Sequence, residues 1–191
     1  MALLTMKKRK QYFKDLGLGE YNEKNIKKFQ KKYMFRARDW DGVYGSDTDN
    51  LLRTCWYILQ YTKDFKAEEF ACECRGRYCC GYPTYMKPKQ LKALQAIRDH
   101  WNKPMTVTSG MRCRGYNSSI GGSISNSLHL QGQATDYYMA GVTDTLANRK
   151  KAIQWIKKLS RHHYSYGNGV NSVGGRPYAP YMGNALHTDT Q

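Results

Sequence analysis

The spacing of apolar residues changes along this chain, and that change constrains the fold more than any other feature. Up to about residue 62 the apolar side chains recur at helical intervals, as in Ile26, Phe29 and Tyr33. From residue 88 onward, helical stripes alternate with short strand-like runs. The helices are expected over 88–101 and 144–163, and the strands over 105–110, 134–140, 164–175 and 185–190. The pattern predicts an all-helical domain over 1–62 followed by an α+β domain over 63–191.

The first domain is expected to contain a helical hairpin. Gly42 and Gly45 punctuate a turn after the first helix. Ser46 or Asp47 is expected to cap the second helix. Its apolar face is predicted to carry Leu51, Leu52, Cys55, Trp56 and Leu59.

The chain is strongly basic, with 31 Lys and Arg against 15 Asp and Glu and a formal net charge of +16. Such a charge favours a polyanionic partner, although the lysines of the first 32 residues equally suit a solvated helix face. Zinc-finger spacing and RNP-type aromatic motifs are absent from the sequence, which argues against a nucleic-acid reader. The apolar runs are too short to predict a transmembrane helix or a secretory signal, so we expect synthesis in a cytoplasm and no stable membrane insertion.

Six cysteines are present, four of them in the stretch "CECRGRYCC" as Cys72, Cys74, Cys79 and Cys80. Without a secretory signal, free or metal-binding thiols are the default. The spacing lacks paired C-x-x-C motifs, and disulfides formed later, for example to Cys113, are an alternative. The sequence leaves free thiols, a structural zinc site and disulfides open.

Two of the five histidines stand beside a carboxylate among small, uncharged residues: His129 with Asp136, and His187 with Asp189. Imidazole nitrogen and carboxylate oxygen are zinc ligands, and catalytic zinc sites use three protein ligands and leave one position open. Gly132 is expected to turn the chain into the strand that carries Asp136. The remaining histidines have simpler interpretations: His100 as a surface residue, and His162 and His163 as partners of a helix C-terminus.

The segments "IKKFQKKY" and "DGVYGSDTDNLL" resemble the peptidoglycan-binding module of cell-wall hydrolases over roughly residues 20–60. Asp41, Gly42, Gly45 and Thr48 match its Asp-Gly-x-x-Gly-x-x-Thr motif. The resemblance implies a wall-binding role, and anionic wall polymers would suit the positive charge.

The segment "SLHLQGQATD" resembles the zinc-binding motif of the D-Ala-D-Ala carboxypeptidase and L-Ala-D-Glu endopeptidase family of metallopeptidases. "TSGMRCRGYN" and "ALHTDT" are similar to two further blocks of that family, in the same order, over roughly residues 65–191. The resemblance implies an antiparallel-sheet peptidase domain with flanking helices. It also implies that His129, Asp136 and His187 bind Zn²⁺, and that Arg112 binds a substrate carboxylate or the developing oxyanion. Ser127 would support the loop by hydrogen bonding.

One position departs from the family pattern. Asn184 stands where many members have the acidic general base, and Ala185 stands where some relatives have a histidine. Asp189 lies two residues after His187, so it shares a strand face with that ligand and is expected either to act as the base or to orient a ligand. Asp144 is a more remote candidate.

These observations together predict a zinc-dependent peptidoglycan peptidase of the phage endolysin type. The expected partners are peptidoglycan and anionic wall polymers, without nucleic acid, and the chain is expected to be a monomer made in the host cytoplasm that reaches the wall after release. A catalytically silent wall-binding protein of the same fold, kept open by Asn184, and a basic nucleic-acid-binding protein are the alternatives. The sequence does not choose between stem-peptide and crossbridge bonds.

Overall fold

A computed structural model of the chain describes residues 2–121, 123–174 and 179–191. Its α-helices are α1 (Met6–Asp15), α2 (Glu23–Tyr33), α3 (Ser46–Tyr61), α4 (Pro88–Trp101), α5 (Arg114–Ser119) and α6 (Leu146–Ile156). Its strands are β1 (Thr106–Ser109), β2 (Ala134–Tyr138), β3 (His162–Gly167), β4 (Val170–Asn171) and β5 (Leu186–Thr190). Short 3-10 helices are η1 (Ala37–Asp39), η2 (Ala67–Phe70), η3 (Leu128–Gln131) and η4 (Pro180–Met182). None of the described helices combines the length and apolar character needed to cross a membrane.

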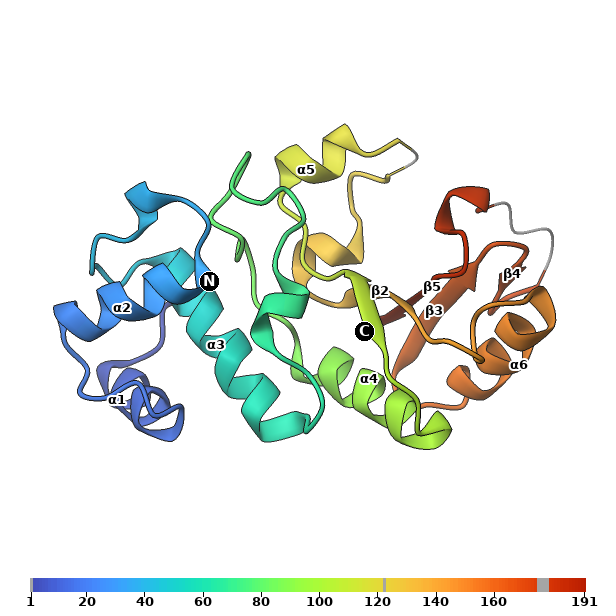
Figure 1. The fold of residues 1–191 in the computed structure, drawn as a ribbon, viewed down its shortest axis with the longest axis horizontal. Helices are drawn as coiled ribbons and strands as arrows, with labels where there is room; N and C mark the ends of the chain where they lie inside the picture. The colour runs from blue at the N-terminus through green and yellow to red at the C-terminus, as the bar shows by residue number, and fades with distance from the viewer. Residues whose placement is uncertain (1, 122, 175–178) are drawn as a thin grey trace.

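The strands form one sheet in the order β1-β2-β5-β3-β4, and every neighbouring pair is antiparallel. Figure 1 shows α1–α3 at one end of the molecule, the sheet and α6 toward the other end, and α4 between them. The expected mixture of helices and an antiparallel sheet is therefore confirmed. Strand β5 is central in this sheet, so the C-terminal segment of the chain lies between β2 and β3.

Helices α2 and α3 occur where the apolar spacing predicts them. Asn22 caps α2 by accepting a hydrogen bond from the Asn25 amide, and the helix buries Ile26 and Phe29. The predicted cap of α3 was wrong: the N-cap residue is Gly45, and Ser46 is already inside the helix. The predicted apolar face of α3 also needs correction. Leu59 is half exposed whereas Ile58 is buried, so the buried face includes Ile58 and not Leu59.

The turn between α2 and α3 is held by the side chain of Gln30, which is almost fully buried. Its amide nitrogen donates to Asp41 Oδ1 (3.0 Å), the Val43 carbonyl (2.9 Å) and Thr48 Oγ1 (3.0 Å). Its amide oxygen accepts from the Gly42 amide at 2.8 Å. The motif residues in this turn therefore have a structural explanation, because one buried side chain satisfies the polar groups of the turn.

Helix α3 packs against α4, and one apolar cluster runs from the N-terminal helices to the sheet. Leu51 and Leu52 of α3 and Leu91 and Leu94 of α4 are fully buried in this cluster. The Met86 amide adds a hydrogen bond of 3.2 Å to Thr54 Oγ1 across the same junction. The division at residues 62 and 63 stays a prediction, and the core is continuous across it.

The helix expected over 144–163 ends at Ile156, so that prediction was too long. Arg161 adopts a positive φ of 67°, which turns the chain into β3. His162 and His163 consequently begin a strand, and their predicted role at a helix C-terminus was wrong. The turn places His163 in the sheet beside the C-terminal strand.

Candidate active site

Two neighbouring strands and the 3-10 helix before one of them bring His129, Asp136 and His187 together. Asp136 of β2 lies directly opposite His187 of β5 in the sheet register. Asp136 Oδ1 lies 2.7 Å from His187 Nδ1 and 3.3 Å from His129 Nε2, and these two nitrogens are 3.2 Å apart. All three side chains are buried, so the sheet gathers the three residues predicted to bind metal around one point.

Gly132 allows η3 to approach the preceding part of the chain. It has a φ of +68°, and a Cβ at this position would lie 2.0 Å from the Tyr85 carbonyl oxygen. The Lys87 amide donates to the Gly132 carbonyl at 2.9 Å. The expected turn at Gly132 is thus present, and only glycine fits its conformation and its close contact.

The donor set fits a tetrahedral metal ion. With zinc–ligand bonds of about 2.0–2.1 Å, neighbouring ligand atoms of a tetrahedron lie about 3.3–3.4 Å apart. Two of the three separations, 3.2 and 3.3 Å, are close to this value, and the third is 2.7 Å. The other ring nitrogens are held as well: His129 Nδ1 lies 2.6 Å from the Gly110 carbonyl, and His187 Nε2 lies 2.9 Å from Asp189 Oδ2. Such outer contacts fix the rings of metal-binding histidines.

The electrostatics of the three residues also suit a cation. Burial would raise the pKa of Asp136, but His129 and His187 outweigh it and hold the pKa well below its usual value. Burial disfavours a charged His187, but its hydrogen bonds to Asp136 and Asp189 prevail and raise its pKa to about 9. Burial lowers the pKa of His129. A divalent cation held by the same atoms would replace the His187 proton as the positive partner of Asp136.

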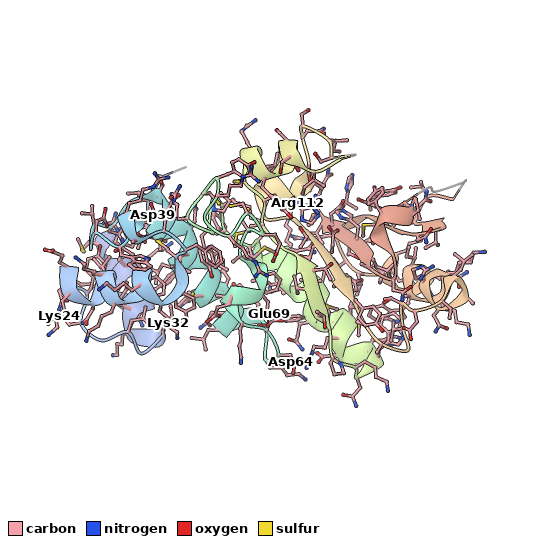
Figure 2. The ribbon with its side chains drawn as sticks, turned by 45° about the horizontal axis from the view of Figure 1, so that its top comes forward. Lys24, Lys32, Asp39, Asp64, Glu69 and Arg112 are labelled. Atoms are coloured by element: carbon pink, nitrogen blue, oxygen red, sulfur yellow. The ribbon has the colours of Figure 1, made fainter. Side chains whose placement is uncertain are left out.

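Arg112 lies beside the three residues, in the central part of the molecule in Figure 2. Its Nη2 donates to Asp136 Oδ2 at 2.5 Å, and its Nε donates to Ser109 Oγ at 2.9 Å. Its backbone amide donates to the His129 carbonyl at 3.1 Å. Arg112 therefore supports the site through its backbone and brings a permanent positive charge to the edge of it.

Asp189 is fully engaged by its neighbours. Oδ2 contacts His187 Nε2, while Oδ1 lies 2.7 Å from His163 Nδ1 and accepts from the Tyr164 amide at 2.9 Å. Burial opposes ionisation of Asp189, but the two histidines lower its pKa overall. This geometry is that of a carboxylate that orients two imidazoles.

His163 is the site residue that the sequence analysis missed. A register irregularity between His162 and Tyr164 interrupts the pairing of β3 with β5, and such bulges re-aim side chains. His163 thereby contacts Asp189 while its side chain remains 45% exposed. The pairing with Asp189 depends on this irregularity, which no local motif predicts.

Of the other sequence candidates, Asn184 and Asp144 do not line the pocket that contains His129, Asp136 and His187, whereas Ser127 does. Asn184 receives a hydrogen bond of 3.4 Å from Arg149 Nη1. Asp144 accepts a hydrogen bond from the Gly141 amide at 2.7 Å. Ser127 supports η3 through its carbonyl, which accepts from the Leu130 amide at 3.0 Å, and its hydroxyl makes no hydrogen bond within the described ranges.

A pocket of about 910 Å³ opens onto the site. Its lining includes Arg112, His129, Asp136, His163, His187 and Asp189. Tyr164, Tyr166 and Tyr181 also line it and give it aromatic surface. The volume is that of a pocket for a small molecule or a short peptide.

A comparison with known families gives a match over the central part of the chain. A family described as Peptidase M15 matches residues 63–170, which is more than half of the chain. The match contains Arg112, His129 and Asp136, while His187 and Asp189 lie beyond its end. A search of curated proteins gave no match. With a family match of this extent over a chain that gathers the expected polar residues in one pocket, the protein belongs to the peptidase M15 family.

Proposed function

We propose that the protein is a zinc-dependent peptidoglycan peptidase that hydrolyses a peptide bond in the stem peptide or crossbridge of bacterial cell walls. The observation that carries the proposal is the convergence of His129 Nε2, Asp136 Oδ1 and His187 Nδ1 at one wall of an open pocket. Membership in a peptidase family supplies the reaction class.

His129, Asp136 and His187 would hold the zinc ion, which supplies Lewis-acid activation of a water and of the scissile carbonyl. Arg112 stands where its guanidinium compensates the negative charge of a substrate carboxylate or of the developing oxyanion. The aromatic side chains of the pocket would exclude water from the bound peptide.

We infer that His163 moves the proton. Its Nδ1 is held by Asp189 and its half-exposed ring lines the pocket, so Nε2 would accept a proton from the attacking water and pass it to the leaving amine. Both oxygens of Asp189 are already used in orienting His163 and His187. We therefore assign Asp189 a positioning role. The role of general base was the other alternative that the sequence left open for it.

The N-terminal helices would bind the wall. The lysines of α2 are exposed, and Figure 2 shows Lys24 and Lys32 on the N-terminal part of the molecule, away from Arg112. A positive surface of this kind suits anionic wall polymers. We propose an endolysin-type monomer that accumulates in a host cytoplasm and acts on the wall after release.

The turbidity of purified cell walls tests the activity. We expect lysis that a chelator abolishes and zinc restores, with His129→Ala and His187→Ala inactive. His100→Ala serves as a matched control, because His100 is exposed and stacks on Trp155 away from the pocket. Full lytic activity in His187→Ala would contradict the metal-site assignment.

Two further measurements separate the alternatives. Mass spectrometry of digested walls should detect new amino termini, whereas a silent wall-binding protein, the alternative favoured by Asn184, would release none. Salt-sensitive retention of DNA in place of walls would favour the nucleic-acid alternative.

The variant His163→Ala tests the proton transfer. It should keep one zinc at the His129 site but lose most of its activity, and the pH dependence of the remaining activity should differ from that of the wild type. An unchanged pH profile would contradict the role of His163.

A further inference from the structure

Four of the six cysteines form a second cluster outside the histidine site. The Sγ atoms of Cys72, Cys74, Cys79 and Cys113 all lie within 4.8 Å of one another, and those of Cys74 and Cys79 are 3.4 Å apart. None of the four is more than 9% exposed. Around a zinc ion with Zn–S bonds of about 2.3 Å, the sulfurs of a tetrahedron lie about 3.8 Å apart, which is within the observed range.

Backbone amides point at three of these sulfurs. Each of the Cys113, Gly81 and Tyr116 amides donates to a sulfur at 3.4 Å, and the respective acceptors are Cys72, Cys79 and Cys113. A donor aimed at sulfur stabilises a thiolate over a thiol, and thiolates are the form that binds metal. These hydrogen bonds would thus stabilise thiolates in both segments that form the cluster, the 72–81 loop and the start of α5.

The loop that carries three of the cysteines has a closed shape. The Cys72 amide donates to the Gly81 carbonyl at 2.8 Å, and Arg75 and Gly76 adopt positive φ values of 47° and 92°. These turns fold residues 72–81 back on themselves and bring the early and late cysteines together. The fourth sulfur comes from Cys113, 41 residues after Cys72 and at the N-cap of α5.

Basic residues outnumber acidic ones next to the cysteines in the sequence. Four thiolates with one divalent cation carry two net negative charges. Arginines stand near the cysteines at positions 75, 77, 112 and 114, against one acidic residue, Glu73, which pairs with Arg75. Nearby cations favour thiolate formation.

We propose that Cys72, Cys74, Cys79 and Cys113 bind a structural zinc ion, separate from the histidine site. Four thiolates complete the tetrahedron and leave no open position for a substrate or water, so the site is structural and not catalytic. The ion would join the 72–81 loop to the segment that begins α5.

The cysteine site would affect the active site through Arg112, which is the residue directly before Cys113 in the chain. Cys113 follows Arg112, whose guanidinium contacts Asp136 and whose amide contacts His129. The loop also contacts the N-terminal part of the chain, because the Phe35 amide donates to the Cys80 carbonyl at 3.0 Å. The cysteine site would therefore fix Arg112 in place and tie the loop to the segment after α2.

Metal analysis of the full-length protein, purified with reducing agent and dialysed against zinc-containing and then zinc-free buffer, tests the proposal. We expect two zinc ions per chain in the wild type. Cys74→Ser and His129→Ala should each retain one, so failure of the histidine site and failure of the cysteine site give different patterns. Cys80→Ser is the matched control, because Cys80 is buried next to Cys79 but outside the cluster, and it should retain two.

Cobalt substitution identifies the ligands without relying on a variant that folds poorly. Wild type and His129→Ala loaded with Co²⁺ should both show thiolate-to-cobalt charge-transfer absorption. Cys74→His should keep the second metal with a shifted spectrum, since three thiolates and one imidazole also form structural sites. A single zinc that disappears in His129→Ala, or an absence of the charge-transfer band in the wild type, would overturn the proposal. Intact-mass detection of disulfides among the four cysteines in the freshly purified, reduced-buffer protein would do so as well.

Discussion

Replacing Gly132 with alanine should damage both stability and the active site. The new Cβ would lie 2.0 Å from the Tyr85 carbonyl oxygen and 2.8 Å from its carbon, so these segments must separate by about 1 Å. The neighbouring Tyr85–Met86 segment cannot yield easily, because the Met86 amide is bound to Thr54 Oγ1.

The magnitude follows from three contributions. A left-handed conformation costs a residue with a side chain about 1–2 kcal/mol. Loss of the hydrogen bond from the Lys87 amide to the Gly132 carbonyl adds about 1 kcal/mol, and the displaced backbone adds about 1–2 kcal/mol of strain. We expect a loss of about 3–5 kcal/mol in the free energy of unfolding. Because the Gly132 amide also donates to the His129 carbonyl, a shift of about 1 Å would reach His129, the proposed metal ligand, and lower kcat/KM about 100-fold.

Urea denaturation, zinc analysis and wall lysis would be measured for Gly132→Ala and for Gly17→Ala. Gly17 has nearly the same φ, +64°, but its Cβ would meet nothing within 4 Å. Its substitution should therefore cost only about 1–2 kcal/mol and leave activity intact. Equal destabilisation of the two variants, or normal activity in Gly132→Ala, would refute the reasoning from the Tyr85 contact.

Three further predictions concern single side chains. Arg112→Lys should keep the positive charge but lose the paired contacts to Ser109 and Asp136, so kcat/KM in wall lysis should fall roughly 10–100-fold while zinc content stays unchanged. Gln30→Ala should lower the free energy of unfolding by about 2–4 kcal/mol in urea, because it leaves the buried polar groups of the turn without partners, and peptidase activity at low temperature should survive. Leu51→Ala should cost about 3–5 kcal/mol in the same assay, since the side chain is fully buried, and a loss below 1 kcal/mol would contradict its place in the core.

Local patterns predicted most of the regular elements. Pro88 and the apolar stripe after it placed α4 correctly, with Leu91, Leu94 and Ile97 buried. The long lysine-rich helix was predicted to reach residue 163, because its composition continues past the point where the chain turns. That turn depends on the positive φ of Arg161, which the packing of β3 into the sheet imposes against the residue's own preference.

The candidate site was predictable to the extent that it follows local motifs. His129 and Asp136 lie in one short segment, and the resemblance of "ALHTDT" to a family block added His187. The structure brings these three residues together, while the metal they bind is still a prediction. The relation of His163 to Asp189 arises from pairing between β3 and β5 with an irregular register, and long-range register is not encoded in a short stretch of sequence.

The apolar core shared by α3 and α4 has a consequence for how such an enzyme would search a wall. A hydrolase on a flexible linker sweeps a volume around its attachment point. Here the helices that carry the exposed lysines and the pocket belong to one packed body, so any polymer held by α2 would meet the pocket at one angle and one offset. From each point of attachment, the pocket would then reach only the few peptide bonds that lie at that offset from α2. Frequent detachment, and therefore weak and short-lived wall binding, would suit catalysis by this molecule better than tight adhesion.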